Sequence, residues 1–325
     1  MKVFVTGGTG NIGQYVVKAL LAAGHSVVLY TRTPRRIPAL CDQPGITAVA
    51  GNMLELEKLK AGLAGCDAVV HIALGWGNTP VEMLDHDTRV TAFLAQEAER
   101  VGVKNFVYTS STAAMGVFHD GIDETAPCLP GDLYGATKAA SEAYLIGFKQ
   151  YYTGQGVRGA KVAMRRNIIR PGYTFSNPAY EGGASQSDVR FRDIARQVLK
   201  GEDLVIGDND GTQFLSSGQI AELYLRMVES ELNEQIVLGL GATWTSWAEI
   251  ARTAVELVPT STSRVLAPDG DVAREPELVC VDKMERLFGL RFDATEALRE
   301  HVQWNLDRER LVLAGEEVHD VYHVW

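Results

Sequence analysis

Hydrophobic residues in the first 110 positions alternate between two periodicities. Short runs rich in β-branched residues have the length of buried strands, whereas the longer stretches between them repeat apolar residues every three or four positions, as helices do. The expected strands are residues 3–6, 26–31, 47–50, 68–72 and 106–109, and the expected helices are residues 12–23, 54–64 and 81–101. Because strands that alternate with helices build a parallel sheet covered on both faces, the pattern predicts a doubly wound α/β fold.

The alternation continues to about residue 172 and then changes. A helix at about 133–152 and a strand at about 162–169 extend the pattern, but residues 173–214 are rich in Gly, Asn, Ser and Asp around one expected helix at 189–200. A helix at 219–229 and the apolar run 236–238 return to the sheet, and further helices are expected near 247–257 and 295–310. The predicted division is a sheet domain, residues 1–172 completed by about 217–240, and a smaller lobe, residues 173–216 and 241–325.

Composition and charge narrow the class of protein. The 325 residues are 46% hydrophobic and 22% charged, which is typical of a globular protein with a large core. A net charge of -10 argues against a nucleic-acid partner and against binding to an anionic membrane. The cysteines form no C-x-x-C pair, and no stretch resembles a signal peptide or a membrane span, so we expect a cytoplasmic protein without a zinc ribbon or disulfide framework.

The strongest local motif is Thr6-Gly7-Gly8-Thr9-Gly10-Asn11-Ile12-Gly13, between the first strand and the first helix. Its three spaced glycines allow a tight turn, a close approach of a pyrophosphate to the backbone, and close packing of the helix on the sheet. Free amides at the start of the helix then bind the anion. The motif therefore predicts dinucleotide binding, with a merely structural glycine turn as the alternative.

The end of the second strand bears on the choice of dinucleotide. A carboxylate there would bind the ribose hydroxyls of NAD, but this chain has Tyr30-Thr31-Arg32 followed by Arg35 and Arg36. Guanidinium groups pair well with a 2'-phosphate, so we expect NADP in preference to NAD; a solvated basic loop is the alternative.

A second motif, Tyr134-Gly135-Ala136-Thr137-Lys138, lies in an expected helix. The four-residue spacing places Tyr134 and Lys138 on one helical face, where the ammonium charge favours the phenolate. A tyrosine in this position can transfer a proton to or from a carbonyl or alcohol oxygen.

Together these motifs resemble the extended short-chain dehydrogenase/reductase superfamily, the NAD(P)-dependent epimerase/dehydratase group, over essentially the whole chain. The matching segments, in order, are T-G-G-T-G-N-I-G, Gly51-Asn52-Met53, His71-Ile72-Ala73, V-Y-T-S-S-T, Y-G-A-T-K and Ile169-Arg170-Pro171-Gly172. The resemblance implies a Rossmann-type dinucleotide-binding domain, a substrate-binding C-terminal lobe, and a homodimer formed through the helices at about 81–101 and 133–152.

The resemblance also implies roles for individual residues. Tyr134 would be the general acid/base, Lys138 would tune it and bind the nicotinamide ribose, and Ser111 would position the substrate, with Thr112 as its neighbour. Trp76 lies where substrates enter in this family, and Thr112 and Tyr173 are also expected to border the substrate. Contacts to the cofactor are expected from Gly7, Thr9, Gly10, Asn11, Ile12, Gly13, Arg32, Arg35, Asn52, Met53, Ile72, Ala73, Leu74, Tyr134, Lys138, Pro171 and Gly172.

Departures from the family pattern bear on the reaction. Residues 112–115 lack the Asp-Glu pair of nucleotide-sugar dehydratases, which disfavours dehydration. Two usual anchors of a nucleotide-sugar substrate are replaced by Tyr173 and Thr212, although Arg190, Arg192 or Arg165 could substitute. The primary hypothesis is therefore an NADP-dependent oxidoreductase acting on a small-molecule carbonyl or secondary alcohol. The alternatives are a sugar epimerase that uses the same three residues through a keto intermediate, and a non-catalytic NADP sensor.

Three isolated features each have a structural explanation that competes with a functional one. His319 and His323 have a spacing that could bind a metal on a helix, but a solvated tail is the better interpretation, and we expect no metal site. His71 is expected to be a packed or backbone-bonded histidine. Trp76, between two glycines, is either a wall of a substrate pocket or a hydrophobic cover over its loop.

Overall fold

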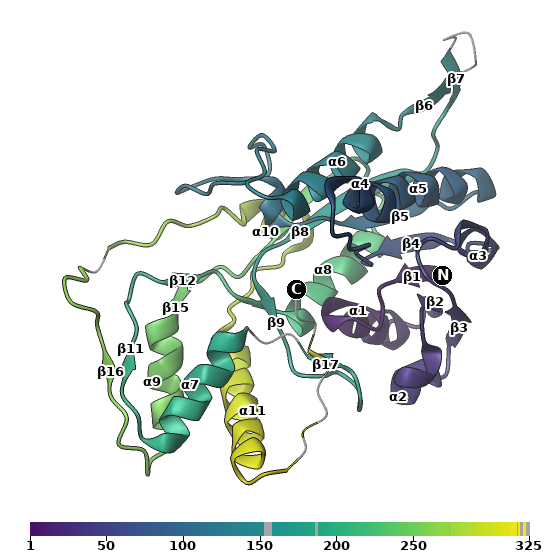
Figure 1. Cartoon of the computed structure of the whole chain (residues 1–325). Coiled ribbons are helices and arrows are strands. Elements are labelled where there is room, and N and C mark those ends of the chain that lie inside the picture. The colour runs from purple at the N-terminus through teal and green to yellow at the C-terminus, as the bar shows by residue number, and fades with distance from the viewer. Residues whose placement is uncertain (153–157, 186–187, 273, 317, 319–320, 323–325) are drawn as a thin grey trace.

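The computed structural model describes residues 1–152, 158–185, 188–272, 274–316, 318 and 321–322, and Figure 1 shows the arrangement of their elements. Seven parallel strands form one sheet in the order β14-β8-β5-β4-β1-β2-β3. These strands are β1 (Lys2–Thr6), β2 (Ser26–Thr31), β3 (Ile46–Ala50), β4 (Ala68–His71), β5 (Asn105–Thr109), β8 (Arg165–Pro171) and β14 (Ile236–Gly239). The predicted doubly wound sheet is confirmed.

Helices cover both faces of this sheet (Figure 1). Alternate residues of β1 point to opposite faces, because Val3 and Val5 join one apolar core and Phe4 joins the other. One face is covered by α1 (Asn11–Ala22), α2 (Pro38–Cys41), α8 (Ser217–Glu229) and α10 (Asp282–Phe288), and the other by α3 (Leu56–Gly62), α5 (Arg89–Val101) and α6 (Leu133–Gly147). A strand buried on both sides explains why the sequence of β1 is continuously apolar.

A third apolar core lies outside the sheet, where α7 (Val189–Lys200), α9 (Trp247–Glu256) and α11 (Thr295–Leu313) pack together. Figure 1 shows these helices as a separate group beside the sheet. Short strand pairs accompany them: β9 (Thr174–Phe175) with β13 (Leu215–Ser216), β11 (Leu204–Val205) with β16 (Val265–Leu266), β12 (Gly211–Thr212) with β15 (Thr245–Ser246), and β10 (Ala184–Ser185) with β17 (Val321–Tyr322).

Two expected helices differ from the structure. The expected helix at 81–101 is divided into α4 (Pro80–Met83), a π-helical turn (Leu84–Thr88) and α5. The helix expected to reach residue 152 ends at Gly147, and β6 (Gln150–Tyr152) pairs with β7 (Arg158–Lys161) instead. Glycine weakens a helix and the following aromatic residues favour a strand, and these local preferences outweigh the apolar spacing that suggested a longer helix.

The segment after β9 ties the third core to the first helix. Gln14 in α1 accepts a hydrogen bond from the backbone nitrogen of Ala179 at 3.0 Å and donates one to the carbonyl oxygen of Ala184 at 2.6 Å. Tyr15 donates to the carbonyl oxygen of Asn177 at 3.1 Å. Residues 177–184 are therefore fastened along α1.

Candidate active site

The strand order reverses between β1 and β4, and the loops that follow these two strands meet there. Gly7 has φ +71°, and a Cβ on it would lie 2.5 Å from the backbone nitrogen of Ala73. A Cβ on Gly13 would lie 2.1 Å from the carbonyl oxygen of Gly7, so the helix packs directly on the loop. In doubly wound sheets this point, outside the carboxyl ends of the strands, is where ligands bind.

The glycine loop leads directly into α1. Gly10 precedes the helix, and its nitrogen donates to the carbonyl oxygen of Gly7 at 3.0 Å. Thr9 lies 3.4 Å from Thr31 between their hydroxyl oxygens, which joins the loop to the end of β2. Asn11 is buried, and its side-chain oxygen accepts hydrogen bonds from Ser176 and Ser217. The Asn11 side chain thus holds neighbouring segments of the protein at the start of the helix, and Ile12 is the second helical residue.

Basic side chains surround the end of β2. Arg32, Arg35 and Arg36 are exposed to solvent. Asn52, after β3, accepts a hydrogen bond from the Tyr30 hydroxyl on its carbonyl oxygen at 2.8 Å and one from the Leu54 nitrogen on its side chain at 2.8 Å. Met53 packs against the apolar core beside it. The two residues predicted to contact the cofactor here, Asn52 and Met53, therefore lie next to each other. The Asn52 side chain stabilises the turn in which it lies.

His71 at the end of β4 is a structural residue. Its Nδ1 lies 2.7 Å from the Thr6 hydroxyl and its Nε2 lies 3.0 Å from the Thr91 hydroxyl. Burial, with the nearby charge of Lys138, lowers the pKa of His71 to about 3. His71 is packed as expected, but its partners are side-chain hydroxyls, and the Thr6 hydroxyl in turn accepts from the nitrogen of Ala73 at 3.3 Å. The start of the predicted cofactor loop, residues 72–74, is fixed in this way.

The start of α6 packs against the turn that follows β5. The Asp132 side chain caps the helix by accepting from the Gly135 nitrogen at 2.6 Å. A Cβ on Gly135 would lie 2.3 Å from the carbonyl oxygen of Ala113, in the 3-10 turn Thr112–Ala114. Ser111 caps that turn by accepting from the Ala113 nitrogen at 3.1 Å. The close contact at Gly135 brings the neighbourhoods of Tyr134 and Ser111 together.

Lys138 lies one turn further along α6 and is almost completely buried. Its Nζ lies 5.9 Å from the centre of the Tyr134 ring and 5.2 Å from that of the Tyr108 ring. An ion pair joins this Nζ to Oδ2 of Asp87 at 3.5 Å. Burial alone would lower the pKa of Lys138, but Tyr108, Asp87 and Tyr134 together outweigh it and raise the pKa. The ammonium form is therefore stable in this interior position.

A second buried ion pair lies on the next turn of the same helix. Glu142 accepts two hydrogen bonds from Arg170 at the end of β8, at 2.9 and 2.7 Å. Glu142 also accepts from the hydroxyl of Ser110, the residue before Ser111. The Cys128 sulfur lies 3.3 Å from the Arg170 guanidinium, and burial, with Glu142 nearby, raises the pKa of this thiol. Arg170 and Glu142 thus join the ends of β5 and β8 to α6.

The remaining predicted residues lie on neighbouring loops. Trp76 is 52% exposed, and its carbonyl oxygen lies 2.8 Å from Nδ1 of His86. Pro171 ends β8, and a Cβ on Gly172 would overlap the side chain of Leu240. The Tyr173 ring packs against Phe214 and Trp247, and its hydroxyl donates to Asp188. Burial, with this hydrogen bond to Asp188, raises the pKa of Tyr173.

The three arginines considered as anchors for a nucleotide-sugar substrate differ in position. Arg165 begins β8, at the opposite edge of the sheet from the glycine loop, and pairs with Glu231. Arg190 stacks on Trp247 at 3.9 Å and pairs with Asp188 and Asp210. Arg192 lies in α7, two residues beyond Arg190. The suggestion that Arg165 could hold substrate phosphates is wrong. Arg165 lies at the amino end of its strand, whereas the glycine loop lies at the carboxyl ends of the parallel strands.

Sequence reasoning missed the partners of the predicted residues. Glu142 continues the four-residue spacing from Tyr134 and Lys138, and Arg170 directly follows the apolar pair Ile168-Ile169 in β8. Both positions are signals of a buried pair. Asp87 falls on the same buried helical face as Met83, Val90 and Leu94. An acidic residue at such a position indicates a buried partner, because carboxylates are rarely buried unpaired.

Two negative findings concern the described residues only. No helix within the described ranges is long and apolar enough to cross a membrane. Among the same residues, no three or more His, Cys, Asp or Glu side chains gather in a way that could hold a metal ion. His319 and His323, where we expected no metal site, lie outside the described residues.

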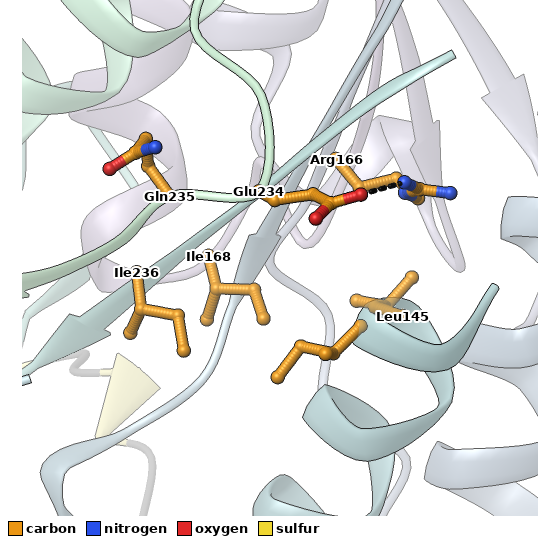
Figure 2. Close-up of a pocket in the computed structure, with 7 residues that line it drawn as sticks. Leu145, Arg166, Ile168, Glu234, Gln235 and Ile236 are labelled. Atoms are coloured by element: carbon orange, nitrogen blue, oxygen red, sulfur yellow. Dashed lines mark hydrogen bonds and ion pairs between the residues drawn. The ribbon is translucent and has the colours of Figure 1, made fainter. Parts of the chain in front are cut away.

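Figure 2 shows a small cavity that is separate from this site. It lies between the end of α6 and the amino ends of β8 and β14, where Arg166 and Glu234 form an ion pair at 2.9 Å. Its volume of about 10 Å³ is enough for about one water molecule. It has no room for a cofactor or substrate.

The fold and the converging loops define a Rossmann-type sheet with a dinucleotide-site geometry. Residues 3–239 match the model of the NAD dependent epimerase/dehydratase family. The chain belongs to this family, as the resemblance implied, and so to the extended short-chain dehydrogenase/reductase enzymes.

Two relatives whose names refer to steroids are similar in sequence to part of this chain. It is 32% identical over 159 residues to a 3-beta-hydroxysteroid dehydrogenase of Mycolicibacterium neoaurum, covering 45% of this chain and 43% of that protein. It is 30% identical over 213 residues to a 3 beta-hydroxysteroid dehydrogenase/Delta 5-->4-isomerase of Mycobacterium tuberculosis strain H37Rv, covering 62% and 52%. The chain spans about half the length of the curated relatives it matches.

Solved structures share the fold over nearly the whole chain. UDP-glucuronic acid 4-epimerase from Bacillus cereus in complex with NAD has a TM-score of 0.72 at 18% identity, covering 98% of this chain and 99% of that one. MoeE5 in complex with UDP-glucuronic acid and NAD has a TM-score of 0.72 at 20% identity, covering 96% and 100%. At these identities the likeness concerns the fold alone.

Proposed function

We propose that this protein is an NAD(P)-dependent oxidoreductase that transfers hydride between its cofactor and a carbonyl or secondary alcohol. The observation that carries the proposal is the meeting of the glycine loop with Ala73 at the point where the strand order reverses. Tyr134 and Lys138 follow the next strand, β5, and so belong to the same edge of the sheet. Family membership supports the same class of reaction.

The residues around the reversal point fit a dinucleotide. A side chain at Gly7 or Gly13 would fill space already closed by backbone atoms, so this part of the loop presents only its backbone. A pyrophosphate would be bound by amides of residues 9–13 at the start of α1. The loop at residues 72–74 and the Pro171-Gly172 turn would border the nicotinamide half.

Three side chains would perform the remaining chemistry. When bound, the nicotinamide supplies or accepts the hydride. Tyr134 transfers a proton to or from the substrate oxygen, and Ser111 hydrogen-bonds that oxygen as its charge develops. The Ser111 oxygen already accepts from the Ala113 nitrogen, which orients the hydroxyl and leaves its hydrogen to donate. Lys138 keeps its charge beside the Tyr134 ring throughout.

We infer that NADP is the preferred cofactor. Arg32 and Arg35 are exposed just beyond β2, and no carboxylate occupies residues 30–36. Guanidinium groups there would pair with a 2'-phosphate. Several solved structures of the same fold contain NAD, so NAD is the alternative that the experiment below must distinguish.

The side chains beyond the sheet favour a substrate without a nucleotide. Arg190 is already paired with two carboxylates, and Tyr173 and Thr212 stand where nucleotide-sugar enzymes of the family have anchors. We therefore assign residues 173–216 and 241–325 to a substrate-binding lobe, with Trp76, Thr112 and Tyr173 at its boundary with the cofactor domain. A sugar epimerase would use the same three residues and consume no cofactor.

We also propose that the protein is a homodimer. Apolar side chains that are exposed on or near α5 and α6 are Leu84, Val101, Leu133, Tyr144 and Ile146. Burying them against a second copy would stabilise the association. A measurement of molar mass in solution distinguishes one copy from two.

A fluorescence titration of the purified protein with NADPH and NADH, after a check for nucleotide already bound, tests the cofactor. Tyr134→Phe then tests the chemistry against a panel of aldehydes and ketones, including steroid ketones. We expect loss of turnover by about 100-fold or more with cofactor affinity retained. The matched control is Tyr144→Phe, which removes an exposed hydroxyl from the same helix. Turnover without net NADPH consumption would support the epimerase instead.

A further inference from the structure

Asp87 is an almost completely buried carboxylate beside the proposed proton-transfer group. It lies in the π-helical turn Leu84–Thr88 and is 1% exposed. Its Oδ1 accepts a hydrogen bond from the Gly75 nitrogen at 3.1 Å, and its Oδ2 lies 3.5 Å from Nζ of Lys138. Oδ2 has no hydrogen bond within the described part of the chain, so its interaction with Lys138 is an ion pair.

The turn that contains Asp87 packs directly against α6. The Thr88 hydroxyl donates to the carbonyl oxygen of Thr137 at 3.2 Å, and the Ser141 hydroxyl lies 3.4 Å from that of Thr88. π-Helical turns shift the register of the side chains that follow them and are frequent at functional sites. Here the turn places two successive residues, Asp87 and Thr88, against two successive residues of α6.

We propose that Asp87 is a positioning residue that holds Lys138 in place and sets how strongly its charge acts on Tyr134. This inference rests on the proposed role of Tyr134 as the proton donor or acceptor. The carboxylate fixes the ammonium through Oδ2 and fixes the loop that precedes Trp76 through Oδ1. One side chain thereby joins the loop expected to border the nicotinamide to the lysine expected to bind its ribose.

The electrostatic consequence follows from the signs of the charges. An ammonium beside Tyr134 favours the phenolate, and a carboxylate paired with that ammonium opposes this effect. Asp87 therefore offsets part of the positive charge that Lys138 exerts on Tyr134.

Other titratable groups around Asp87 do not replace this effect. Burial lowers the pKa of His71 to about 3, so its imidazole is neutral at working pH. Burial raises the pKa values of Tyr108 and Tyr224, so both phenols are also neutral. Within the described residues, the titratable groups that act electrostatically on Asp87 or its lysine partner are His71 on β4, Tyr108 on β5, Tyr134 and Lys138 on α6, and Tyr224 on α8. His86 is the neighbour of Asp87 on the same turn.

The test is an ultraviolet titration of tyrosinate in the cofactor-free protein, which needs no substrate. The difference between a protein and its Tyr134→Phe counterpart isolates Tyr134 among the 11 tyrosines. We expect Asp87→Asn and Asp87→Ser each to move the Tyr134 midpoint to lower pH by about one unit. Glu97→Gln, which removes a carboxylate paired with Arg100 on α5, is the matched control and leaves the midpoint in place.

Each result has a defined meaning. An unchanged midpoint in Asp87 variants that fold, as judged by thermal melting, would overturn the proposal, and so would failure of both variants to fold, which would assign Asp87 to folding alone. Once a substrate is found, the pH profile of kcat/KM should move by the same amount. If no hydride transfer is ever observed, the optical shift still decides the role of Asp87 separately from the proposed reaction.

Discussion

The backbone nitrogen of Ala73 lies 2.5 Å from the position that a Cβ on Gly7 would occupy. Two loops from separate strands therefore touch at their backbones, and only glycine permits this contact. Gly7 also has φ +71°, a conformation that L-residues with a side chain adopt at a cost of about 1–2 kcal/mol.

Gly7→Ala should abolish nucleotide binding, because the added methyl group forces the two loops apart. The control is Gly24→Ala, since Gly24 has a similar φ of +78° but nothing within 4 Å of its Cβ position. The control should lose about 1 kcal/mol of stability and keep its affinity for nucleotide. Fluorescence titration and thermal melting measure both properties. Equal affinities in the two variants would show that the loops can separate without affecting the ligand.

Arg32→Ala should reduce affinity for NADPH by roughly 10-fold or more and leave affinity for NADH within about twofold, because a charge-assisted hydrogen bond is worth about 1.5–3 kcal/mol. The control is Arg226→Ala, which removes an exposed arginine from α8. The measurement is a pair of binding curves for each protein. A proportional loss for both nucleotides would point to general electrostatic attraction, and tighter binding of NADH by the wild type would reverse the proposed preference.

Removing one partner of the Glu142–Arg170 ion pair should lower the free energy of unfolding more than replacing both residues with apolar ones. Glu142→Leu leaves the Arg170 guanidinium buried without its carboxylate, so we expect a loss of about 3–5 kcal/mol in the free energy of unfolding. Adding Arg170→Met to that variant should restore part of the loss, since no unpaired charge then remains. Urea denaturation measures both. A double variant less stable than the single one would contradict this account.

Acidification should destabilise the protein through its buried histidines. Burial lowers the pKa of His301 to about 3, whereas an unfolded histidine titrates near 6.5. The unfolded state therefore binds a proton first, and the stability present above about pH 6.5 is lost as pH falls toward 3. His301→Gln should reduce the slope of unfolding free energy against pH by about 1.4 kcal/mol per unit between pH 6 and 4.

The sequence was sufficient for features that depend on local spacing. Residues close together in the chain are enough to predict the glycine loop, the strand-helix alternation and the spacing of Tyr134 and Lys138. The partners of these residues could not be predicted, because Asp87 and Lys138 are separated by 51 positions and meet only through the packing of the π-helical turn on α6. The same holds for Arg170, whose charge is evident in the sequence but whose partner is chosen by the crossing of β8 and α6.

The hydrogen bonds that fasten residues 177–184 along α1 have a consequence for engineering. Grafting the substrate lobe of a relative onto this chain would separate Gln14 and Tyr15 from the backbone groups of Asn177, Ala179 and Ala184. Buried polar groups left without partners would then oppose folding of the chimera. Such a transplant therefore has to include matching residues from the first helix, even though that helix belongs to the sheet domain.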